Sequence, residues 1–498
     1  MAIPILTVAP REMKGLNQAI DANLLDLSYS PDCQNIDVSE GILSVRRGSS
    51  LFNGTVGFPV AAAPYTIHKI LQFSDARDIG LPAYVIGTMD GVTIRWYAWL
   101  SNSSGTKEWR LITTTAGGAT AAMTSVDPRR AYGINYPISG NKRLIVLGNS
   151  KPFKLEFSMS GSEERIHATE ISAAPNGDFM TLHRERMWIG NAFDNKVYYS
   201  NAFNPEDWTT AGQTGEIIIE TGDGDKIIGV ENLLDDVIIF KQNTIWRVSG
   251  DIPSEYSLSQ VYATQGTIHA KSICSDGSYC YFAGADGIYQ YTGNDAVPVL
   301  TDAIKTVFKS MQSVKCKMHD SVLYAWDMRT GTGYAGKHIA YDVIRKKVSI
   351  VKAQDIYDLE IVLQVGSINK VLYTDGLYIY DLDNSLLFRT MAIEAYWITP
   401  ETDLGSPNAS KTLTDMYFTG WGSTNAGAAG GQVKITAYYN ESGTQKNKEK
   451  TVTLQTTRKL HNVQWNVTGR LFKFKIENVS GSIFNLSNLQ FVFEVDRD

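Results

Sequence analysis

The stretch MWIGNAFDNKVYYSNAFNPEDW, residues 187 to 208, predicts a β-hairpin that ends in a loop. Residues 187–190 and 196–200 are rich in β-branched and aromatic side chains, which favour strands, and a polar turn separates them. In the loop that follows, an Asn-Pro pair sets a turn and Trp208 offers an apolar anchor. Nothing in the stretch is chemically reactive, so it indicates a β scaffold whose loops make contacts.

The same unit recurs along the chain: an apolar strand, a turn containing Gly, Asn or Asp, and a second strand with an aromatic residue near its end. Six hairpins of this kind are predicted at residues 84–99, 144–157, 187–200, 237–249, 280–292 and 371–382, and a seventh, less regular one with a long Gly-rich tip at 323–343. They repeat at roughly 40 to 60 residues, the spacing of four-stranded propeller blades. Further short strands, such as 227–232 and 270–277, are expected in the gaps.

A closed ring of blades accounts for this repetition. One small blade cannot bury both of its faces, whereas a ring of blades buries all but its outer edges and its central channel. The repeats are degenerate, with no repeated WD signature, no kelch double glycine and no SxDxGxTW box. We therefore predict an all-β protein in which residues 53–385 form a β-propeller-like ring of short antiparallel blades.

Residues 1–52 have the pattern of an extended N-terminal arm rather than a domain. Prolines at positions 4, 10 and 31 interrupt any helix, and a turn at Gly41 precedes a final short strand. Arg46 and Arg47 follow in that strand. We expect their guanidinium groups either to bind a neighbouring carboxylate or to lie solvated at the strand end.

From about residue 386 onward, apolar and polar residues alternate cleanly. The alternating segments are residues 393–405, 413–422, 432–443, 449–455, 461–467, 470–481 and 486–497. Such alternation is typical of antiparallel sheets with one buried face. Residues 386–498 are therefore predicted to form a separate C-terminal β-sandwich.

One segment of the predicted ring breaks the β pattern. Residues 301–312 place Ile304, Val307, Phe308 and Met311 on one helical face. We expect a short amphipathic helix packed on the ring, with Thr301 as its N-cap.

The composition is ordinary for a globular protein, with 43% apolar and 20% charged residues in a chain of 498. The net charge of −6 gives no positive excess for neutralising phosphates, so tight sequence-specific DNA binding is not expected. Four scattered cysteines do not make a disulfide framework. Cys274 and Cys280 could face each other across a hairpin, but buried thiols are the preferred interpretation. Neither a secretion signal nor a membrane span is predicted.

Motifs for metal, phosphate and nucleophile chemistry are missing, including HExxH, the P-loop, the GxSxG elbow and Cys-His clusters. Asp223 and Asp225 lie among glycines and could offer oxygen ligands to Ca²⁺, but the later ligands of a calcium loop are missing and a turn explains them better. A carboxylate pair for glycoside hydrolysis could come from distant positions, and none can be nominated. We therefore predict no enzyme activity, no catalytic residues, no cofactor and no metal.

Four groups of segments, taken in order, carry a family resemblance. They are GLN, CQNIDV and GILSVRRG (15–48), RMWIGN, VYYSN and PEDW (186–208), GDGDKIIG, VIIFK and TIWRVSGD (222–251), and DGIYQYTG (286–293). The sequence resembles tail hub or nozzle proteins of short-tailed bacteriophages over about two-thirds of the chain. The motifs are structural, and similar sequences also occur in minor tail proteins of other phages.

The resemblance implies a β-propeller subunit of the virion tail, made in the host cytoplasm. Such subunits assemble as a homohexameric ring below the portal and adaptor, form the conduit through which DNA passes without sequence-specific binding, and dock fibres or a plug. Phe203, Trp208, Arg46 and Arg47 are the expected partner contacts, although Trp208 could instead pack under its own hairpin. A receptor- or carbohydrate-binding propeller and, less favoured, a propeller glycosidase are the alternatives.

Overall fold

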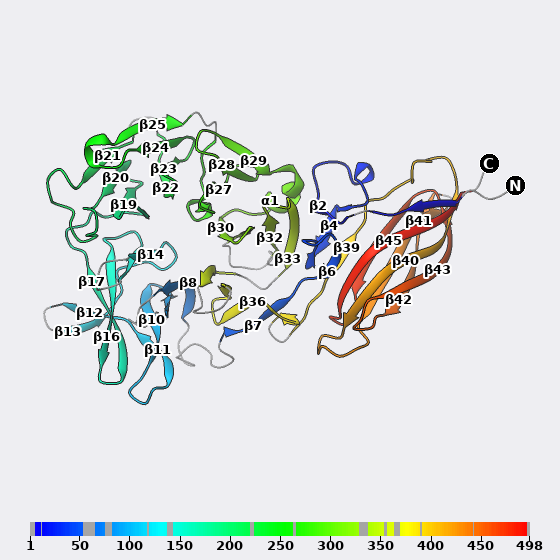
Figure 1. Ribbon diagram of the computed structural model, residues 1–498, viewed down its shortest axis with the longest axis horizontal. Coiled ribbons are helices and arrows are strands. Elements are labelled where there is room, and N and C mark those ends of the chain that lie inside the picture. Colours follow the sequence, from blue (N-terminus) through cyan, green and yellow to red (C-terminus); the bar gives the residue numbers. More distant parts are fainter. Residues whose placement is uncertain are drawn as a thin grey trace.

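A computed structural model describes residues 5–10, 12–52, 65–74, 82–116, 119–136, 143–219, 224–261, 265–327, 337–352, 356–362, 369–388, 391–441 and 443–495. These residues form a ring of small antiparallel sheets with a β-sandwich beside it (Figure 1). The prediction of an all-β, propeller-like fold is confirmed. Within the described residues strands dominate, and the one α-helix, α1 (Lys305–Phe308), has four residues.

Seven consecutive sheets of the described chain, here called blades 1 to 7, make up the ring. Blade 1 contains β8 (Thr66–Phe73), β9 (Ala83–Asp90), β10 (Thr93–Ser101) and β11 (Lys107–Leu111); blade 2 contains β14 (Tyr132–Tyr136), β15 (Arg143–Leu147), β16 (Phe153–Ser160) and β17 (Glu163–Glu170), with β12 (Thr113–Ala116) and β13 (Ala119–Ala122) at its edge; blade 3 contains β18 (Phe179–His183), β19 (Arg186–Asn191), β20 (Lys196–Tyr199) and β21 (Gly215–Ile218).

The remaining blades have the same four-stranded plan. Blade 4 contains β22 (Ile227–Leu233), β23 (Asp236–Lys241), β24 (Ile245–Ser249) and β25 (Ser257–Val261); blade 5 contains β26 (Cys274–Ser275), β27 (Cys280–Ala283), β28 (Ile288–Tyr291) and β29 (Ala296–Leu300); blade 6 contains β30 (Val314–His319), β31 (Val322–Asp327), β32 (Lys337–Asp342) and β33 (Lys347–Lys352); blade 7 contains β34 (Asp358–Val362), β35 (Lys370–Thr374), β36 (Ile379–Ser385) and β7 (Gly48–Leu51), with β37 (Leu387–Phe388) and β38 (Met391–Ala392) at its edge.

Each predicted hairpin forms the second and third strands of one blade. In blade 3, Trp188 of β19 pairs with Tyr199 of β20, and Trp188 is fully buried. Asn195 turns the chain between them at φ +49°, a left-handed conformation that Asn tolerates better than most residues. The tip of the seventh hairpin, residues 328–336, lies outside the described residues.

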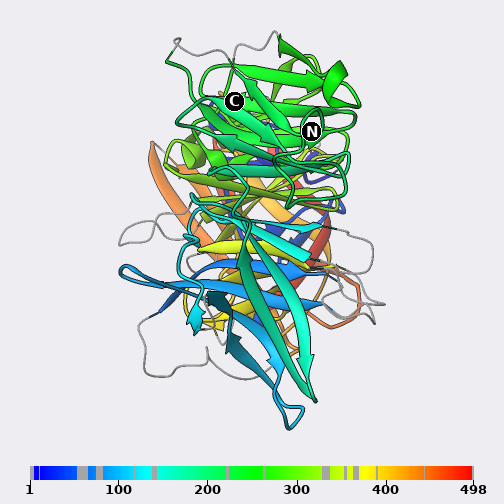
Figure 2. The same cartoon turned by 90° about the vertical axis from the view of Figure 1, so that its left-hand side faces the viewer.

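The first strands of the blades surround the ring axis, and neighbouring first strands such as β18 and β22, or β34 and β8, lie against each other (Figure 1). Buried aliphatic and aromatic side chains fill the spaces between blades. At the outside of blade 2 the long strands β16 and β17 extend beyond their neighbours, as the view of the ring from its edge shows (Figure 2).

The N-terminal segment closes the ring. β7 pairs antiparallel with β36, with Ser50 opposite Asp381, so blade 7 takes its fourth strand from the beginning of the chain. Gly48 is required at this point, because a Cβ atom there would lie 2.2 Å from the carbonyl oxygen of Leu387. Blades 7 and 1 then pack through buried side chains that include Ile70 and Val362.

The C-terminal segment folds as a sandwich of two sheets. Its strands are β39 (Tyr396–Ile398), β40 (Lys411–Ser423), β41 (Gln432–Glu441), β42 (Thr444–Thr453), β43 (Lys459–Gly469), β44 (Phe472–Asn478) and β45 (Ile483–Val495). One sheet contains β43, β40 and β45, and the other contains β39, β44, β41 and β42. Phe474 and Phe491 stack between the sheets with ring centroids 4.2 Å apart.

The short strands of the arm are β1 (Ile5–Val8), β2 (Gly15–Leu16), β3 (Tyr29–Ser30), β4 (Asp32–Gln34), β5 (Ile36–Asp37) and β6 (Leu43–Val45). β1 and β6 pair with β45 in one sandwich sheet, and β4 pairs with β39 in the other. β2 pairs with β33 at the outer edge of blade 6. The arm therefore adds strands to both sheets of the sandwich as well as to the propeller.

The predicted helix at residues 301–312 is shorter than expected. A 3-10 turn, η5 (Asp302–Ile304), leads into α1, and the predicted apolar face is buried. The N-cap prediction was wrong: the Thr301 side chain makes no capping hydrogen bond, because its backbone lies at φ −116°, ψ −78° rather than in the extended conformation of a cap. Other 3-10 turns are η1 (Ala22–Leu24), η3 (Pro253–Glu255) and η4 (Ala270–Ser272).

The four cysteines are buried free thiols, as expected from the sequence. Burial raises the pKa of the Cys274 thiol well above its ordinary value, so it stays protonated and packs as an apolar side chain. None of the helices in the described part of the chain has the length or hydropathy to span a bilayer.

Candidate docking sites

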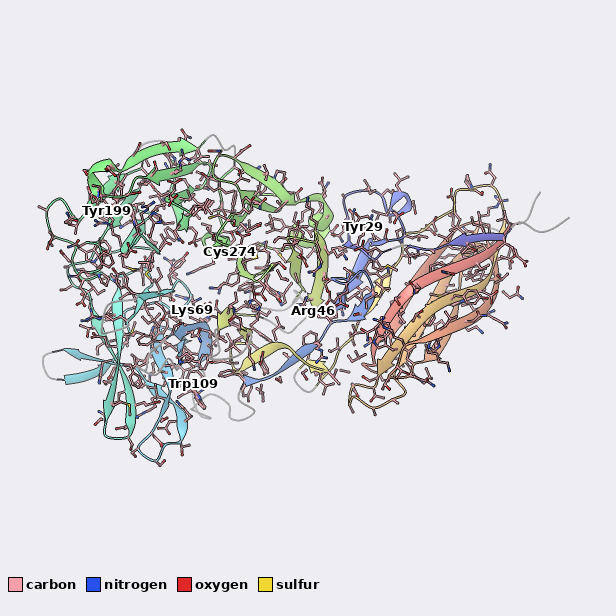
Figure 3. All side chains as sticks on the ribbon, viewed as in Figure 1. Tyr29, Arg46, Lys69, Trp109, Tyr199 and Cys274 are labelled. Atoms are coloured by element: carbon pink, nitrogen blue, oxygen red, sulfur yellow. The ribbon has the colours of Figure 1, made fainter. Side chains whose placement is uncertain are left out.

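A polar groove of about 570 Å³ lies where the arm, blade 6 and the sandwich meet. Residues of the arm and blade 6 supply nearly all of its lining, and Asn485 of β45 completes it. Both arginines singled out in the sequence line this groove, and Figure 3 shows Arg46 at the junction between the propeller and the sandwich. We call it the junction groove.

Arg46 holds the arm against blade 6. Its backbone N–H donates to the carbonyl oxygen of Asn35 at 2.9 Å. Its guanidinium donates to the hydroxyl of Tyr324 at 3.3 Å and lies 5.7 Å from the centre of that ring, within the range of a cation–π contact. Arg46 therefore has a binding role inside the chain.

Arg47 differs from its neighbour. It is exposed, lines the junction groove and makes no ion pair with any residue that the structure describes. The structure thus places Arg47 where a partner could reach it, whereas the contacts of Arg46 orient the strand that presents it.

Two further cationic residues of the groove, Arg345 and Lys347, bond to other residues of the chain. Burial alone would raise the pKa of Asp342, but hydrogen bonds from the backbone N–H and the guanidinium of Arg345, both at 2.8 Å, outweigh burial and lower that pKa. Lys347 donates to the carbonyl oxygens of Val38 and Ser39 at 3.0 and 3.2 Å. These bonds fix the shape of the groove walls.

Lys347 also reaches the start of the arm. Its ammonium lies 2.6 Å from a carboxylate oxygen of Glu12, and this hydrogen bond lowers the pKa of Glu12. The groove consequently exists only while the arm is bound to blade 6. Its exposed charges, which include Arg47, Glu40 and Asp320, suit an extended polar segment of a partner better than an apolar ligand.

Phe203 lies on the opposite side of the ring, in the turn between β20 and β21. Phe203 is 68% exposed. Its backbone takes φ +60°, a conformation that is strained for a residue that carries a Cβ atom. The hydrogen bond from its N–H to the carbonyl oxygen of Glu185, at 2.9 Å, helps to hold this turn. Phe203 is therefore exposed, and its role as a partner contact stays a prediction.

Two more exposed apolar residues come from blade 4 and lie near the same turn. Arg184, which precedes Glu185, pairs with Asp235 at 2.8 Å and with Asp251 at 2.6 Å. Leu234 and Ile252 adjoin these two aspartates in sequence and are 71% and 49% exposed. We call Phe203, Leu234 and Ile252 the blade 3–4 patch.

Trp208 is not part of this patch. It is half-buried against a cluster that includes Tyr136 and Met187, and its indole N–H donates to the carbonyl oxygen of Pro205 at 2.8 Å. This placement matches the alternative in which Trp208 packs beneath its own hairpin.

The sequence interpretation did not include Tyr324, Arg345 and Lys347 in the site. The basic run at 345–347 is visible in the sequence, but it lies some 300 residues from the arm that it contacts. Leu234 and Ile252 were missed as well. An apolar residue next to aspartate in a predicted turn, as in Leu234-Asp235, was the available signal.

Asp225 precedes β22, and its carboxylate supports the turn between β23 and β24. Its carboxylate accepts hydrogen bonds from the backbone of Asn243 and the hydroxyl of Thr244, both at 2.8 Å. Asp223 lies outside the described residues. In the part of the chain that the structure describes, no group of three or more His, Cys, Asp or Glu side chains is placed to hold a metal ion.

Comparison with known proteins shows likeness in structure and none in sequence families. No protein-family profile matches the sequence, and no curated protein matches it. The WD40 domain of Neurospora crassa Pan2 is similar to the chain at a TM-score of 0.39 and 11% sequence identity, over 74% of this chain and 99% of that domain.

Proposed function

We propose that this protein is a structural subunit of a bacteriophage tail, a nozzle or hub below the portal and adaptor, which docks further tail proteins such as fibres or a plug. The sequence segments that resemble such proteins support the proposal, and so does the combination of a propeller, a sandwich and an arm. On this proposal the protein acts by holding neighbours, and it is not an enzyme.

The observation that carries the proposal is the presence of two unlike surfaces on opposite sides of the ring. The blade 3–4 patch presents three exposed apolar side chains beside the exposed carboxylates of Asp235 and Asp251, and the junction groove presents exposed charges that include Arg47. In Figure 3, Tyr199 of blade 3 and Arg46 lie on opposite sides of the ring centre. In a closed ring of identical subunits, one surface of each subunit contacts the other surface of its neighbour, so this arrangement suits a homo-oligomeric ring. The family resemblance implies that this ring is a homohexamer.

The conduit function follows from the proposed ring. Duplex DNA passing through a tail must slide, and a protein of net charge −6 has no surplus of cations with which to hold it. We propose that DNA passes through the lumen between subunits without sequence-specific binding.

Assembly of the purified chain, alone and with a portal–adaptor complex, tests the proposal. We expect negative-stain microscopy and mass photometry to show a ring. Phe203→Asp combined with Ile252→Asp should abolish the ring, because both residues are exposed and the charges would be buried at the contact. Leu234 is left unchanged because it also lines a cavity on the propeller axis. Val92→Asp is the matched control, since Val92 is 91% exposed in a turn of blade 1.

Two outcomes would contradict the proposal. One is that no ring forms on the adaptor. The other is that the double variant assembles as well as the wild type. Binding or cleavage of host polysaccharide by the isolated chain would instead favour a receptor-binding propeller or a glycosidase.

A further inference from the structure

A second cavity, of about 540 Å³, lies on the axis of the propeller and is lined by residues from all seven blades. We call it the axial pocket. Lys69 of blade 1 and Cys274 of blade 5 both contribute to its lining, and Figure 3 shows them across the centre of the ring from each other. Its size falls within the range of about 300 to 1,000 Å³ that is usual for small-molecule sites.

Three lysines share two carboxylates on one wall of the axial pocket. Lys69 lies 3.1 Å from Asp358 and 3.7 Å from Glu360. Lys315 lies 3.3 Å from Asp358, and Lys317 lies 2.9 Å from Glu360. These five groups come from β8, β30 and β34. Because three ammonium groups face two carboxylates, the wall has a surplus of positive charge.

The other carboxylate of the pocket, Glu231, removes only part of this surplus at neutral pH. Burial raises the pKa of Glu231 to about 7, and Glu231 makes no ion pair with the residues that the structure describes. Burial also lowers the pKa of Lys271 well below its ordinary value, and its amino group donates to the carbonyl oxygens of Arg130 and Ala131 at 2.8 Å. The surplus on the wall comes from Lys69, Lys315 and Lys317 and does not depend on the protonation state of Lys271.

Confining the surplus positive charge destabilises the charged form of one lysine. Burial lowers the pKa of Lys315, the most enclosed lysine of the wall, although it faces Asp358. An anion in the pocket would offset this cost, because it supplies the missing negative charge in a site of low dielectric constant.

Side chains that line the axial pocket can bind an oxyanion. Lys317 keeps 34% of its side chain exposed, more than Lys69 or Lys315, and its ammonium lies 2.9 and 3.1 Å from the two carboxylate oxygens of Glu360, so an anion would share it with that carboxylate. Asn232, which also lines the pocket, adds an amide that can donate hydrogen bonds, whereas the hydroxyl of Thr181 donates to the Glu231 carboxylate at 3.4 Å.

We propose that the axial pocket binds a small oxyanion, a phosphate or carboxylate group carried by a molecule of metabolite size, with Lys317 as the principal cation and Asn232 as a neutral donor. The proposal does not depend on the proposed role in a tail. The competing interpretation is that the charged wall only joins blades 6, 7 and 1.

Isothermal titration of the full-length protein with inorganic phosphate and with citrate, against chloride at equal ionic strength, separates the two interpretations. We expect saturable binding of phosphate, citrate or both, and the stronger of the two identifies the group. Lys317→Met should weaken binding about tenfold or more, and Lys317→Arg should retain it, because the pocket needs a cation at this position. Lys459→Met, an exposed lysine of the sandwich, is the matched control.

Circular dichroism establishes that each variant is folded. Glu231→Gln provides a second variant if Lys317→Met does not fold, and it should bind severalfold more tightly than the wild type at pH 8, where Glu231 is charged. The proposal is overturned if neither anion binds saturably. It is equally overturned if Lys317→Met, or Glu231→Gln in its place, binds with wild-type affinity.

Discussion

Asp358 receives two ammonium groups and one backbone N–H at the seam where blades 6, 7 and 1 meet. Burial alone would raise its pKa, but Lys69 and Lys315 outweigh burial and hold the pKa at about 2, compared with an ordinary value of 3.8. Because the folded-state pKa is depressed, the stabilisation is present above pH 4 and is lost as the pH falls toward 2.

We predict that Asp358→Asn lowers the free energy of unfolding at pH 7 by about 3 kcal/mol, because it leaves buried ammonium groups without their carboxylate. Urea denaturation of the folded protein measures the loss. Asp375→Asn is the control: Asp375 accepts turn hydrogen bonds from Leu377 and Tyr378, which an amide oxygen can also accept. Equal stability of the two variants would contradict a stabilising role for the seam.

The pKa of Glu231 is shifted in the opposite direction to the pKa of Asp358. Its folded-state pKa of about 7 lies above the ordinary 4.5, so folding disfavours its charged form. The cost is absent below pH 4.5, grows as the pH rises toward 7 and is complete above it. Glu231→Gln should therefore be more stable than the wild type at pH 8, by at most about 3 kcal/mol, and equally stable near pH 4.

Thermal unfolding of both proteins across this pH range measures the difference. Glu255→Gln, at an exposed position, should follow the wild type throughout. A Glu231→Gln advantage that stays constant with pH would mean that the ionisation of Glu231 is not its cause.

At the scale of elements, strand β7 decides whether the ring closes. A Cβ atom at Gly48 would meet the backbone of Leu387, which cannot move without disturbing blade 7. We predict that Gly48→Ala costs about 2 kcal/mol of stability. Leu51→Ala, in the same strand but 43% exposed, should cost much less. Urea denaturation measures the free energy of unfolding of both variants. Equal losses would show that the steric contact at Gly48 is not the cause of the destabilisation.

Elements with local signals were predictable, and those that depend on distant partners were not. The hairpins were found because a turn residue and flanking β-branched and aromatic residues lie within about fifteen residues of one another. The pairing of β7 with β36 joins segments more than 300 residues apart, and no local pattern specifies it. From the sequence pattern we predicted the order of the arm and the sandwich along the chain. The pattern did not show that strands of the arm pair with both sheets of the sandwich.

The same limit applies to the candidate sites. Exposure at Phe203 was predictable from an aromatic residue in a polar loop, whereas the partner of Arg46, Tyr324, was not. The axial pocket was missed altogether. Its signal was two pairs of charged residues on alternate positions of apolar strands, Lys315 with Lys317 and Asp358 with Glu360, which place both members of each pair on one strand face.

At the scale of the whole molecule, the arm makes the propeller and the sandwich parts of one body. Strands β1, β4 and β6 pair with the sandwich, β2 pairs with blade 6, and β7 belongs to blade 7. A surface that spans both domains, such as the junction groove, keeps its shape only if these pairings hold. The two domains should accordingly unfold together.

Deletion of residues 1–47 tests this coupling, because it removes β1 to β6 and leaves β7 to close the ring. For the full chain we expect one calorimetric transition. For the deletion we expect two, with the sandwich unfolding first, since its sheets lose strands on β45 and β39 and expose edges to water. A loss of about 2 kcal/mol in the free energy of unfolding of the sandwich would lower the melting temperature of this domain by about 10 °C. Deletion of residues 1–10, which removes β1 alone, should have a smaller effect. If the sandwich melts at the same temperature with and without residues 1–47, the arm does not couple the domains, and the junction groove cannot act as a single rigid surface.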